Sequence, residues 1–310
     1  MKVAITGISG RFGRLLAGRL HRSHTVVGID RRTCRDVPKD VEVHCIDIRR
    51  KRCEKIFRAH RFDAVVHLNV VHDPRASSSD HYTFNIQGTD RVMAHCVRHG
   101  VKKLILLSSA NVYGPRPDNT QFLTEDAPLM GGERFSEIRD LVGVDMLGQS
   151  FFWKYPQIET VILRPVHIIG SVHNAPSNYL RLKRPWALAG YDPVVQVIHE
   201  DDVARAIEFA LRPDVQGIFN VSGCEATPLS HLHRLAGCKP ILLPHMVAGP
   251  VLNRLFGMRL TTFPAPELDH LRYVCMVDGQ RATETLGFKP RFDLAQTMEH
   301  LRLSRRLATL

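Results

Sequence analysis

The stretch KVAITGISGRFGRLLAGRL (residues 2–20) is the strongest indication of the fold, because it joins two kinds of secondary structure through closely spaced glycines. Its first five residues are rich in β-branched side chains, which is typical of a buried strand, and its last ten have the apolar spacing of a helix. Gly7, Gly10 and Gly13 lie between and just inside these elements, three residues apart. Glycines at such a turn let the backbone bend sharply and approach a bound group, while the helix start offers free N–H groups to an anion. The stretch therefore predicts a phosphate-binding strand–turn–helix unit.

An acidic residue follows at the distance expected for a dinucleotide site. The second apolar run, TVVGID (25–30), ends in Asp30, whose carboxylate would bind the hydroxyls of an adenosine ribose. Arg31 and Arg32 come next and could instead receive the 2′-phosphate of NADP. Because Asp30 would repel that phosphate, we expect NAD as the cofactor and leave NADP open.

Short apolar runs alternate with longer helical segments as far as residue 170. This rhythm is typical of βαβ units, so the sequence predicts an α/β fold, a Rossmann-type doubly wound parallel sheet with a smaller C-terminal region. We expect the NAD(P)-binding core at residues 1–170 and a mainly substrate-binding region at 171–310, with segments near 196–223 returning to the core. The expected strands and the two longest helices are VEVHCID (41–47), DAVVHL (63–68), KLILLSS (103–109), ETVILRP (159–165), and helices near 80–99 and 134–155.

Composition excludes several classes of protein. No window of the 310 residues approaches the roughly 20 apolar residues of a membrane span, so we expect no membrane partner. The seven cysteines are scattered without the Cys/His spacing of a zinc site, which favours a reducing cytoplasm and predicts no metal. The net charge is +11, and its densest run is RRKRCEKIFRAHR (49–61). We interpret that run as a surface helix with a solvated basic face, which argues against nucleic acid as a partner.

The chain resembles the extended short-chain dehydrogenase/reductases, and more narrowly the NAD-dependent epimerase/dehydratase group that includes UDP-glucose 4-epimerase-like proteins. The motifs that carry the resemblance are Thr6–Gly13, Asp30, Asp47 in CIDI, VVHLN, Asn85 in NIQGT, SSANVYG (108–114), LRPVHIIG (163–170), IHEDDVARAI and GIFNVSG. The cofactor-binding residues that it implies are Gly7, Gly10, Arg11, Phe12, Gly13, Asp30, Arg31, Asp47, Ile48, Leu68, Asn69, Ser108 and Arg164.

The resemblance also implies where substrate and partner would bind. A nucleotide sugar is the expected substrate class, in contact with Tyr113, His167, Arg181 and Lys183. Three alternatives stay open from the residues alone: Tyr113 as a packed aromatic, His167 as a structural histidine, and the basic segment SVHNAPSNYLRLKRPW (171–186) as a surface helix. The family further implies a homodimer through the two long helices.

One family feature is missing from ERFSEIRDLVGVD (133–145). The family carries Tyr-xxx-Lys on this helix, where the tyrosine moves the proton of a sugar hydroxyl, yet this chain has no tyrosine between 114 and 154 and no lysine between 104 and 153. Alignment on the following segment places Glu137 and Leu141 at these positions. The family's catalytic serine falls on Ser109 and its structural asparagine on Asn85. We therefore expect either an NAD(P)-dependent epimerase or reductase that uses Ser109, Glu137 and Asn85, or a non-catalytic dinucleotide sensor or scaffold.

Overall fold

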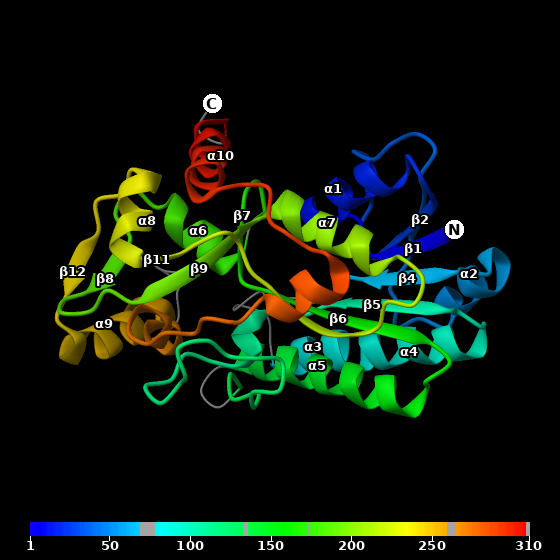
Figure 1. The fold of residues 1–310 in the computed structure, drawn as a ribbon, viewed down its shortest axis with the longest axis horizontal. Helices are drawn as coiled ribbons and strands as arrows, with labels where there is room; N and C mark the ends of the chain where they lie inside the picture. Colours follow the sequence, from blue (N-terminus) through cyan, green and yellow to red (C-terminus); the bar gives the residue numbers. More distant parts are fainter. Residues whose placement is uncertain (69–77, 133–135, 173, 259–264, 308–310) are drawn as a thin grey trace.

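A parallel sheet of seven strands forms the centre of the protein. The computed structural model describes residues 1–68, 78–132, 136–172, 174–258 and 265–307. The strand order is β10-β6-β5-β4-β1-β2-β3, so the direction of winding reverses between β1 and β4 (Figure 1). Doubly wound sheets bind ligands at this reversal point. The predicted α/β Rossmann-type fold is confirmed. The strands are β1 (Lys2–Thr6), β2 (Thr25–Asp30), β3 (Glu42–Cys45), β4 (Ala64–His67), β5 (Lys103–Leu107), β6 (Glu159–Pro165) and β10 (Gly217–Val221).

Helices cover both faces of the sheet because its central strands are apolar on both sides. In β1, Val3 and Ile5 pack into one core while Ala4 packs into the other. The first core lies under α1 (Arg11–Leu20) and α7 (Glu200–Ala210). The helices of the opposite face are α2 (Arg52–His60), α4 (Gly88–Arg98) and α5 (Ser136–Lys154) (Figure 1).

The basic run folds as the surface helix that the sequence predicts. In α2, Cys53, Ile56 and Phe57 are buried against the sheet, and the basic side chains occupy the other face. The helix ends at Arg61, whose φ of 49° lies in the left-handed region. The charge of this run is thus compatible with an ordinary amphipathic helix.

The helix expected near 80–99 is interrupted. It consists of α3 (Ser78–Tyr82), a π-helical turn η1 (Thr83–Gln87) and α4. The Thr89 hydroxyl donates to the Asn85 carbonyl oxygen at 2.5 Å, and the Asn85 side chain is buried. Single π turns inside helices are frequent at functional sites. A π turn contains one residue more than an α-helical turn. The spacing of apolar residues in the sequence does not indicate this change.

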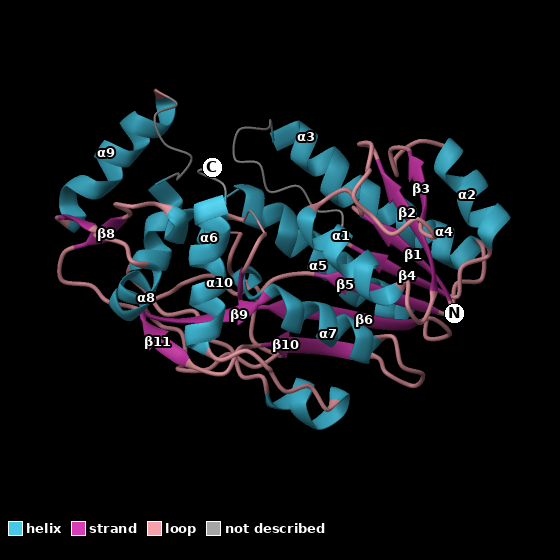
Figure 2. Ribbon diagram, turned by 90° about the horizontal axis from the view of Figure 1, so that it is seen from above, coloured by secondary structure: helices cyan, strands magenta, loops and turns pink. Residues whose placement is uncertain are grey.

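The C-terminal part forms a smaller lobe beside the carboxyl ends of the strands. Figure 2 shows its helices and short strands at the end of the molecule opposite to β2, β3 and α2. β7 (His167–Ile169), β9 (Val194–His199) and β11 (Ala226–Pro228) form one small sheet, and β8 (Trp186–Leu188) pairs with β12 (Ile241–Leu243). Residues 200–221 return to the large sheet as α7 and β10. The other elements are η2 (Ala110–Val112), α6 (Ala175–Arg181), α8 (Leu229–Ala236), α9 (His245–Gly257), η3 (Ala265–Leu271), η4 (Ala282–Leu286) and α10 (Leu294–Leu307).

In the described ranges, no helix is both long and apolar enough to pass through a bilayer.

Candidate functional site

The glycine-rich turn packs so tightly that only glycine fits at its third position. A Cβ atom on Gly13 would lie 2.4 Å from the Gly7 carbonyl oxygen and 2.7 Å from the Ile8 Cα atom. Gly7 itself has a φ of 83°, a conformation that favours glycine. At Gly10 the fit is looser, since its Cβ would lie 3.3 Å from the Gly7 oxygen. The turn thus brings the start of α1 directly against the end of β1.

The start of α1 is built to receive an anion. Gly10 is the N-cap and offers no side-chain oxygen to the first N–H groups, and within the described structure the first helical turn holds no acid. The buried Ser9 hydroxyl has no hydrogen-bond partner among the described residues. Uncapped N–H groups and a buried polar atom without a partner are what a pyrophosphate would satisfy. Arg11 is exposed, and Phe12 is half-buried against the core.

Asp30 lies beside this turn, at the end of β2. Its carboxylate accepts the Ser9 N–H at 3.1 Å and the Arg32 N–H at 3.0 Å, and the residue is 2% exposed. These two bonds fix its orientation while leaving lone pairs for further donors. The neighbouring Arg31 side chain is exposed, with its guanidinium 4.7 Å from the centre of the Phe84 ring. A ribose contact for Asp30 stays a prediction with suitable geometry.

Asp47 forms a close ion pair with Arg49 next to the same ring. The shortest N···O distance is 2.6 Å, and the Arg49 guanidinium lies 5.2 Å from the centre of Phe84. Burial opposes ionisation of Asp47, but its hydrogen bonds with Arg49 outweigh that effect and hold the pKa of Asp47 below its usual value. Ile48 is buried and close to Gly88, so the structure gives it a packing role.

His67 ends β4 on the other side of the winding reversal and was not predicted from the sequence. Its Nδ1 atom lies 2.6 Å from the Thr6 hydroxyl, and its Nε2 atom lies 3.0 Å from the Thr89 hydroxyl. Because Thr89 donates to the Asn85 carbonyl, Nε2 must carry the proton that Thr89 accepts. Burial lowers the pKa of His67 to about 4, so the ring is neutral. Leu68 follows it, half-buried, and the predicted Asn69 lies outside the described residues.

A buried polar network joins β5, α5, β6 and β10. Asp145 accepts the Ser108 hydroxyl at 2.6 Å and two nitrogens of Arg164 at 2.6 and 2.9 Å. Arg164 also donates to the Tyr113 hydroxyl at 2.7 Å, which in turn donates to Asn220 at 2.8 Å. Burial raises the pKa of Tyr113 to about 12, so its hydroxyl is protonated. All five side chains are buried.

Two residues that were expected at ligands lie inside this network. Arg164 is 0% exposed and Tyr113 is 1% exposed, and both are bonded within the protein. The geometry therefore supports the alternative for Tyr113, a packed aromatic, and gives Arg164 and Ser108 structural roles. Ligand contact by these side chains stays a prediction that this arrangement does not support. The sequence did not predict the ion pair that buries Arg164, because its partner Asp145 lies 19 residues earlier in the chain.

Ser109 sits where β5 turns toward α5. It is half-buried, and its Oγ atom accepts the Asn111 N–H at 3.2 Å as the cap of η2. A Cβ atom on Gly131 would lie 2.2 Å from the Asn111 carbonyl oxygen, so the segment leading into α5 lies directly against this turn. The backbone of Glu137 belongs to α5, but its side chain lies outside the described part of the chain. Leu141 is 1% exposed and contributes to the core.

His167 has an imidazole neighbour that the sequence did not indicate. Its ring centre lies 6.0 Å from that of His270 in η3. Burial lowers the pKa of His167 to about 4 and that of His270 to about 3, yet both residues keep some exposed surface. A substrate contact by His167 stays a prediction, and His270 joins it as a candidate.

Arg181 supports the loop that follows β7. It donates to the carbonyl oxygens of Gly170 and Val172 and to the hydroxyl of Ser304 at 3.2 Å. On the other side of the loop, Glu200 accepts the N–H groups of Ser171 at 2.7 Å and Val172 at 2.9 Å. Side chains of α6 and α7 thus hold the loop from two sides.

The expected substrate contacts of this segment are only partly supported. The guanidinium of Arg181 is committed to carbonyl oxygens, while Lys183 is exposed. Arg11 reaches the same loop from α1, with its guanidinium 3.3 Å from the Ser171 carbonyl oxygen. Tyr179 and Lys183 have the Tyr-xxx-Lys spacing, outside the helix where the family carries it. Tyr179 is buried and its hydroxyl donates to the Trp186 carbonyl at 2.6 Å, which supports a structural role.

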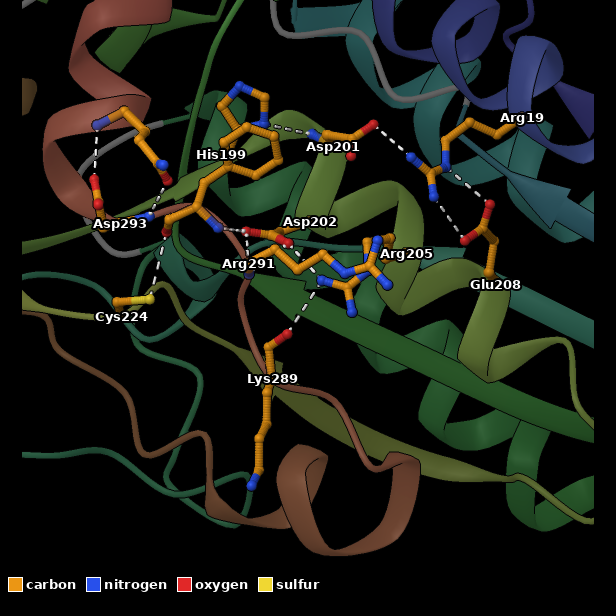
Figure 3. A network of polar contacts seen from close by, with 12 residues as sticks. Arg19, His199, Asp201, Asp202, Arg205, Glu208, Cys224, Lys289, Arg291 and Asp293 are labelled. Atoms are coloured by element: carbon orange, nitrogen blue, oxygen red, sulfur yellow. Dashed lines mark hydrogen bonds and ion pairs between the residues drawn. The ribbon is translucent and has the colours of Figure 1, made fainter.

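A second polar network attaches the C-terminal segment to α7 (Figure 3). Asp202 accepts the N–H groups of Arg291 and Phe292 at 2.9 and 3.1 Å, and it pairs with Arg205 at 2.8 Å. The His199 ring stacks on Phe292 with centres 3.8 Å apart. The IHEDDVARAI motif is therefore explained by packing of distant segments, and its polar groups are bonded within the protein.

The profile of the NAD dependent epimerase/dehydratase family matches residues 3–222. Among curated relatives, an uncharacterized protein of Mycobacterium tuberculosis is 25% identical over 257 residues, which cover 82% of this chain and 68% of that protein. UDP-glucose 4-epimerase 2 of Oryza sativa subsp. japonica is 32% identical over 149 residues, which cover 47% of this chain and 35% of that enzyme.

Solved structures share the whole fold. The UDP-glucose 4-epimerase of Thermotoga maritima, crystallised with UDP-glucose, matches with a TM-score of 0.81 at 18% identity and with 100% of both chains covered. The UDP-glucose 4-epimerase of Thermus thermophilus, in complex with NAD, matches with a TM-score of 0.76 at 21% identity, covering 97% of this chain and 99% of that one. At these identities the likeness establishes the fold.

Proposed function

Because the chain belongs to the NAD dependent epimerase/dehydratase family, we propose that it binds NAD and acts on a nucleotide sugar as an epimerase or reductase with atypical acid–base groups. The observation that carries the proposal is the uncapped start of α1, packed against β1 and bordered by the unpartnered Ser9 hydroxyl. The related UDP-glucose 4-epimerase of known structure that carries NAD supports the choice of cofactor.

The residues present fit a dinucleotide. The N–H groups after Gly10 would hold the pyrophosphate, Asp30 would accept the ribose hydroxyls, and Asp47 would lie near the adenine. Bound NAD would supply a hydride acceptor. The remaining chemistry belongs to the chain: it must orient the sugar and move the proton of a hydroxyl group.

Ser109 and Glu137 are the proposed proton-handling residues. Ser109 is half-buried at the turn that faces the start of α5, so its hydroxyl can hold a sugar hydroxyl in place. A carboxylate at residue 137 would accept that proton, but at neutral pH an ordinary glutamate is a poor acid. Leu141 is apolar and buried, so it offers no charge to tune a neighbour. We therefore expect oxidation of the sugar to be favoured over its reversal. The buried Asn85 would support α5 from η1.

The second candidate is a non-catalytic dinucleotide sensor or scaffold. It is favoured by the buried Leu141 at the position of the family's lysine, because the cofactor half of the cleft is retained without that cation. The two candidates differ in turnover and agree in NAD binding.

The test measures NAD binding by calorimetry and conversion of UDP-galactose to UDP-glucose for the wild type, Glu137→Ala and Ser109→Ala. Wild-type turnover that is low and falls about 10²-fold or more in both variants supports the proposed roles. Turnover at the level of an ordinary epimerase that survives Glu137→Ala refutes them. Tight NAD binding without turnover of any sugar nucleotide favours the sensor, and absence of NAD binding refutes both candidates.

The expected homodimer is also a proposal. On α5, Met146 is 59% exposed and Trp153 is 80% exposed, seven residues apart and therefore on one side of the helix. Large exposed apolar side chains on one helix are typical of an interface. Sedimentation of the wild type and of Trp153→Glu would reveal a dimer and its loss.

A further inference from the structure

Two histidines and a glutamate converge at the outer edge of the large sheet. Glu42 and His44 are two residues apart in β3, so their side chains leave the strand on the same face. His60 is the last residue of α2, which packs on that face. Sequence spacing did not reveal the group, because one ligand comes from a helix that begins after the strand has ended.

The three side chains present their donor atoms to one point. The His44 Nε2 atom lies 3.1 Å from the His60 Nε2 atom and 3.0 Å from a Glu42 Oε1 atom, and the His60 Nε2 atom lies 3.7 Å from the same oxygen. Two Nε2 atoms at this distance cannot both carry protons without clashing. The cluster therefore has room for a single proton or for one cation.

The size of this triangle matches a tetrahedral metal site. Ligands about 2.0–2.1 Å from a zinc ion lie roughly 3.3 Å apart at the corners of a tetrahedron. The three observed distances, 3.0, 3.1 and 3.7 Å, lie around that value. Two imidazoles with one carboxylate are typical ligands of Zn²⁺ and related transition metals, whereas Ca²⁺ and Mg²⁺ require mostly oxygen ligands.

The surroundings hold the imidazoles in place and leave one side open. The His60 ring stacks on Phe62 with an 8° angle between planes, and it meets the His44 ring edge to face. Glu42 is 56% exposed, so the fourth position of a tetrahedron can be filled by water.

We propose that Glu42, His44 and His60 form a transition-metal site, with Zn²⁺ as the fitting ion, that ties the edge strand β3 to the end of α2. The site is separate from the cofactor cleft. Glu42 pairs with Val27, three residues before Asp30, so it lies roughly 10 Å further down the sheet from the carboxyl ends of the strands. Its role is therefore to fasten an unpaired sheet edge, independent of turnover.

The experiment uses the full chain, freed of metal with a chelator, and titrates it with ZnCl₂ by calorimetry. Wild type should bind one equivalent of Zn²⁺ and show a higher Tm with the ion, with no such response to MgCl₂. His44→Gln and His60→Gln should each weaken this binding at least 10-fold. The matched control is His21→Gln, since His21 is also partly exposed and pairs with Asp40 at 3.1 Å outside the cluster.

The Tm of each variant without metal identifies a variant that fails to fold. In that case Glu42→Gln is a milder test, because glutamine keeps the shape of the glutamate side chain and removes its charge. Co²⁺ in place of Zn²⁺ should give the strong visible absorption of tetrahedral coordination in wild type and His21→Gln. The proposal is overturned by wild-type protein that binds no Zn²⁺, or by binding that is equal in wild type and in both glutamine variants of the cluster.

Discussion

The two halves of the candidate site, at the ends of β1 and β5, differ in how far they match the family's sequence pattern. At the end of β1, the glycines, Asp30 and the uncapped helix start occupy the arrangement that a dinucleotide requires. At the end of β5, Ser109 caps η2, and the proposed alignment puts the buried Leu141 of α5 where the family carries a cation. Under the proposed function, NAD binding and catalysis are separable in this chain, and retention of one does not imply retention of the other.

The largest expected effect concerns the buried ion pair of Arg164 and Asp145, in the network between these halves. Arg164→Met leaves the Asp145 charge buried without its partner, which should reduce the free energy of unfolding by about 3–5 kcal/mol. The double variant Arg164→Met with Asp145→Leu should recover most of that loss. Urea unfolding measures both.

The double variant also tests whether Arg164 belongs to the cofactor site. If Arg164 is structural, NAD affinity of the refolded double variant stays within a few-fold of wild type. A stable double variant whose NAD affinity is about 100-fold lower would show that Arg164 contributes to the cofactor site.

The pH dependence of stability tests the neutral His67 in the cofactor half. Burial lowers the pKa of His67 to about 4, against about 6.5 in the unfolded chain. Between these values the unfolded chain binds the proton and the folded chain does not, so stability falls as pH falls from 6.5 to 4, by up to roughly 3 kcal/mol. Urea unfolding of His67→Gln across this range should show a shallower slope. His21→Gln is the control, and an unchanged slope in His67→Gln would contradict the neutral ring.

The sequence predicted these regions unequally for a physical reason. Strand and helix positions follow from local apolar spacing, and the glycine-rich turn, Asp30 and the amphipathic α2 were all predicted in place. The π turn around Asn85 and the neighbours of His67 depend on contacts between separate elements. Local spacing carries no information about such contacts.

Long-range polar pairs were the least predictable part. Tyr113 and Arg164 were expected at ligands, a prediction that is still to be tested. Their side chains bond to Asn220 and Asp145, which β10 and α5 bring into the core and which the sequence did not indicate as partners. Asp202 likewise accepts N–H groups 89 and 90 residues later in the chain. A motif fixes which residue is present, while the partner that it bonds is set by the fold.

Gly10→Val tests the cofactor half directly. The φ of Gly10 is −64°, which any residue can adopt, and its Cβ would lie 3.3 Å from the Gly7 oxygen, its nearest neighbour, so the protein should fold. The added side chain would occupy the space in front of the helix start, and NAD affinity should fall at least about 100-fold, or about 2.7 kcal/mol. Gly18→Val in the same helix is the matched control, since nothing lies within 4 Å of its Cβ position. Equal NAD affinity in the two variants would show that the glycine-rich turn is not part of the NAD site.

The smallest expected effect is a change in the choice between NAD and NADP. Asp30→Asn removes the charge that would repel a 2′-phosphate, and the exposed Arg31 and Arg32 remain beside it. The Ser9 and Arg32 N–H groups donate to different oxygens of Asp30, so asparagine keeps an acceptor for only one of them. We expect the ratio of NADP to NAD affinity to rise about 10-fold, or about 1.4 kcal/mol. Asp36→Asn is the control, because it removes the same charge from a 78% exposed side chain that pairs with Arg14. Calorimetry with both dinucleotides measures the ratio. If Asp30→Asn and Asp36→Asn change it equally, the effect arises from net charge, and Asp30 does not face the ribose.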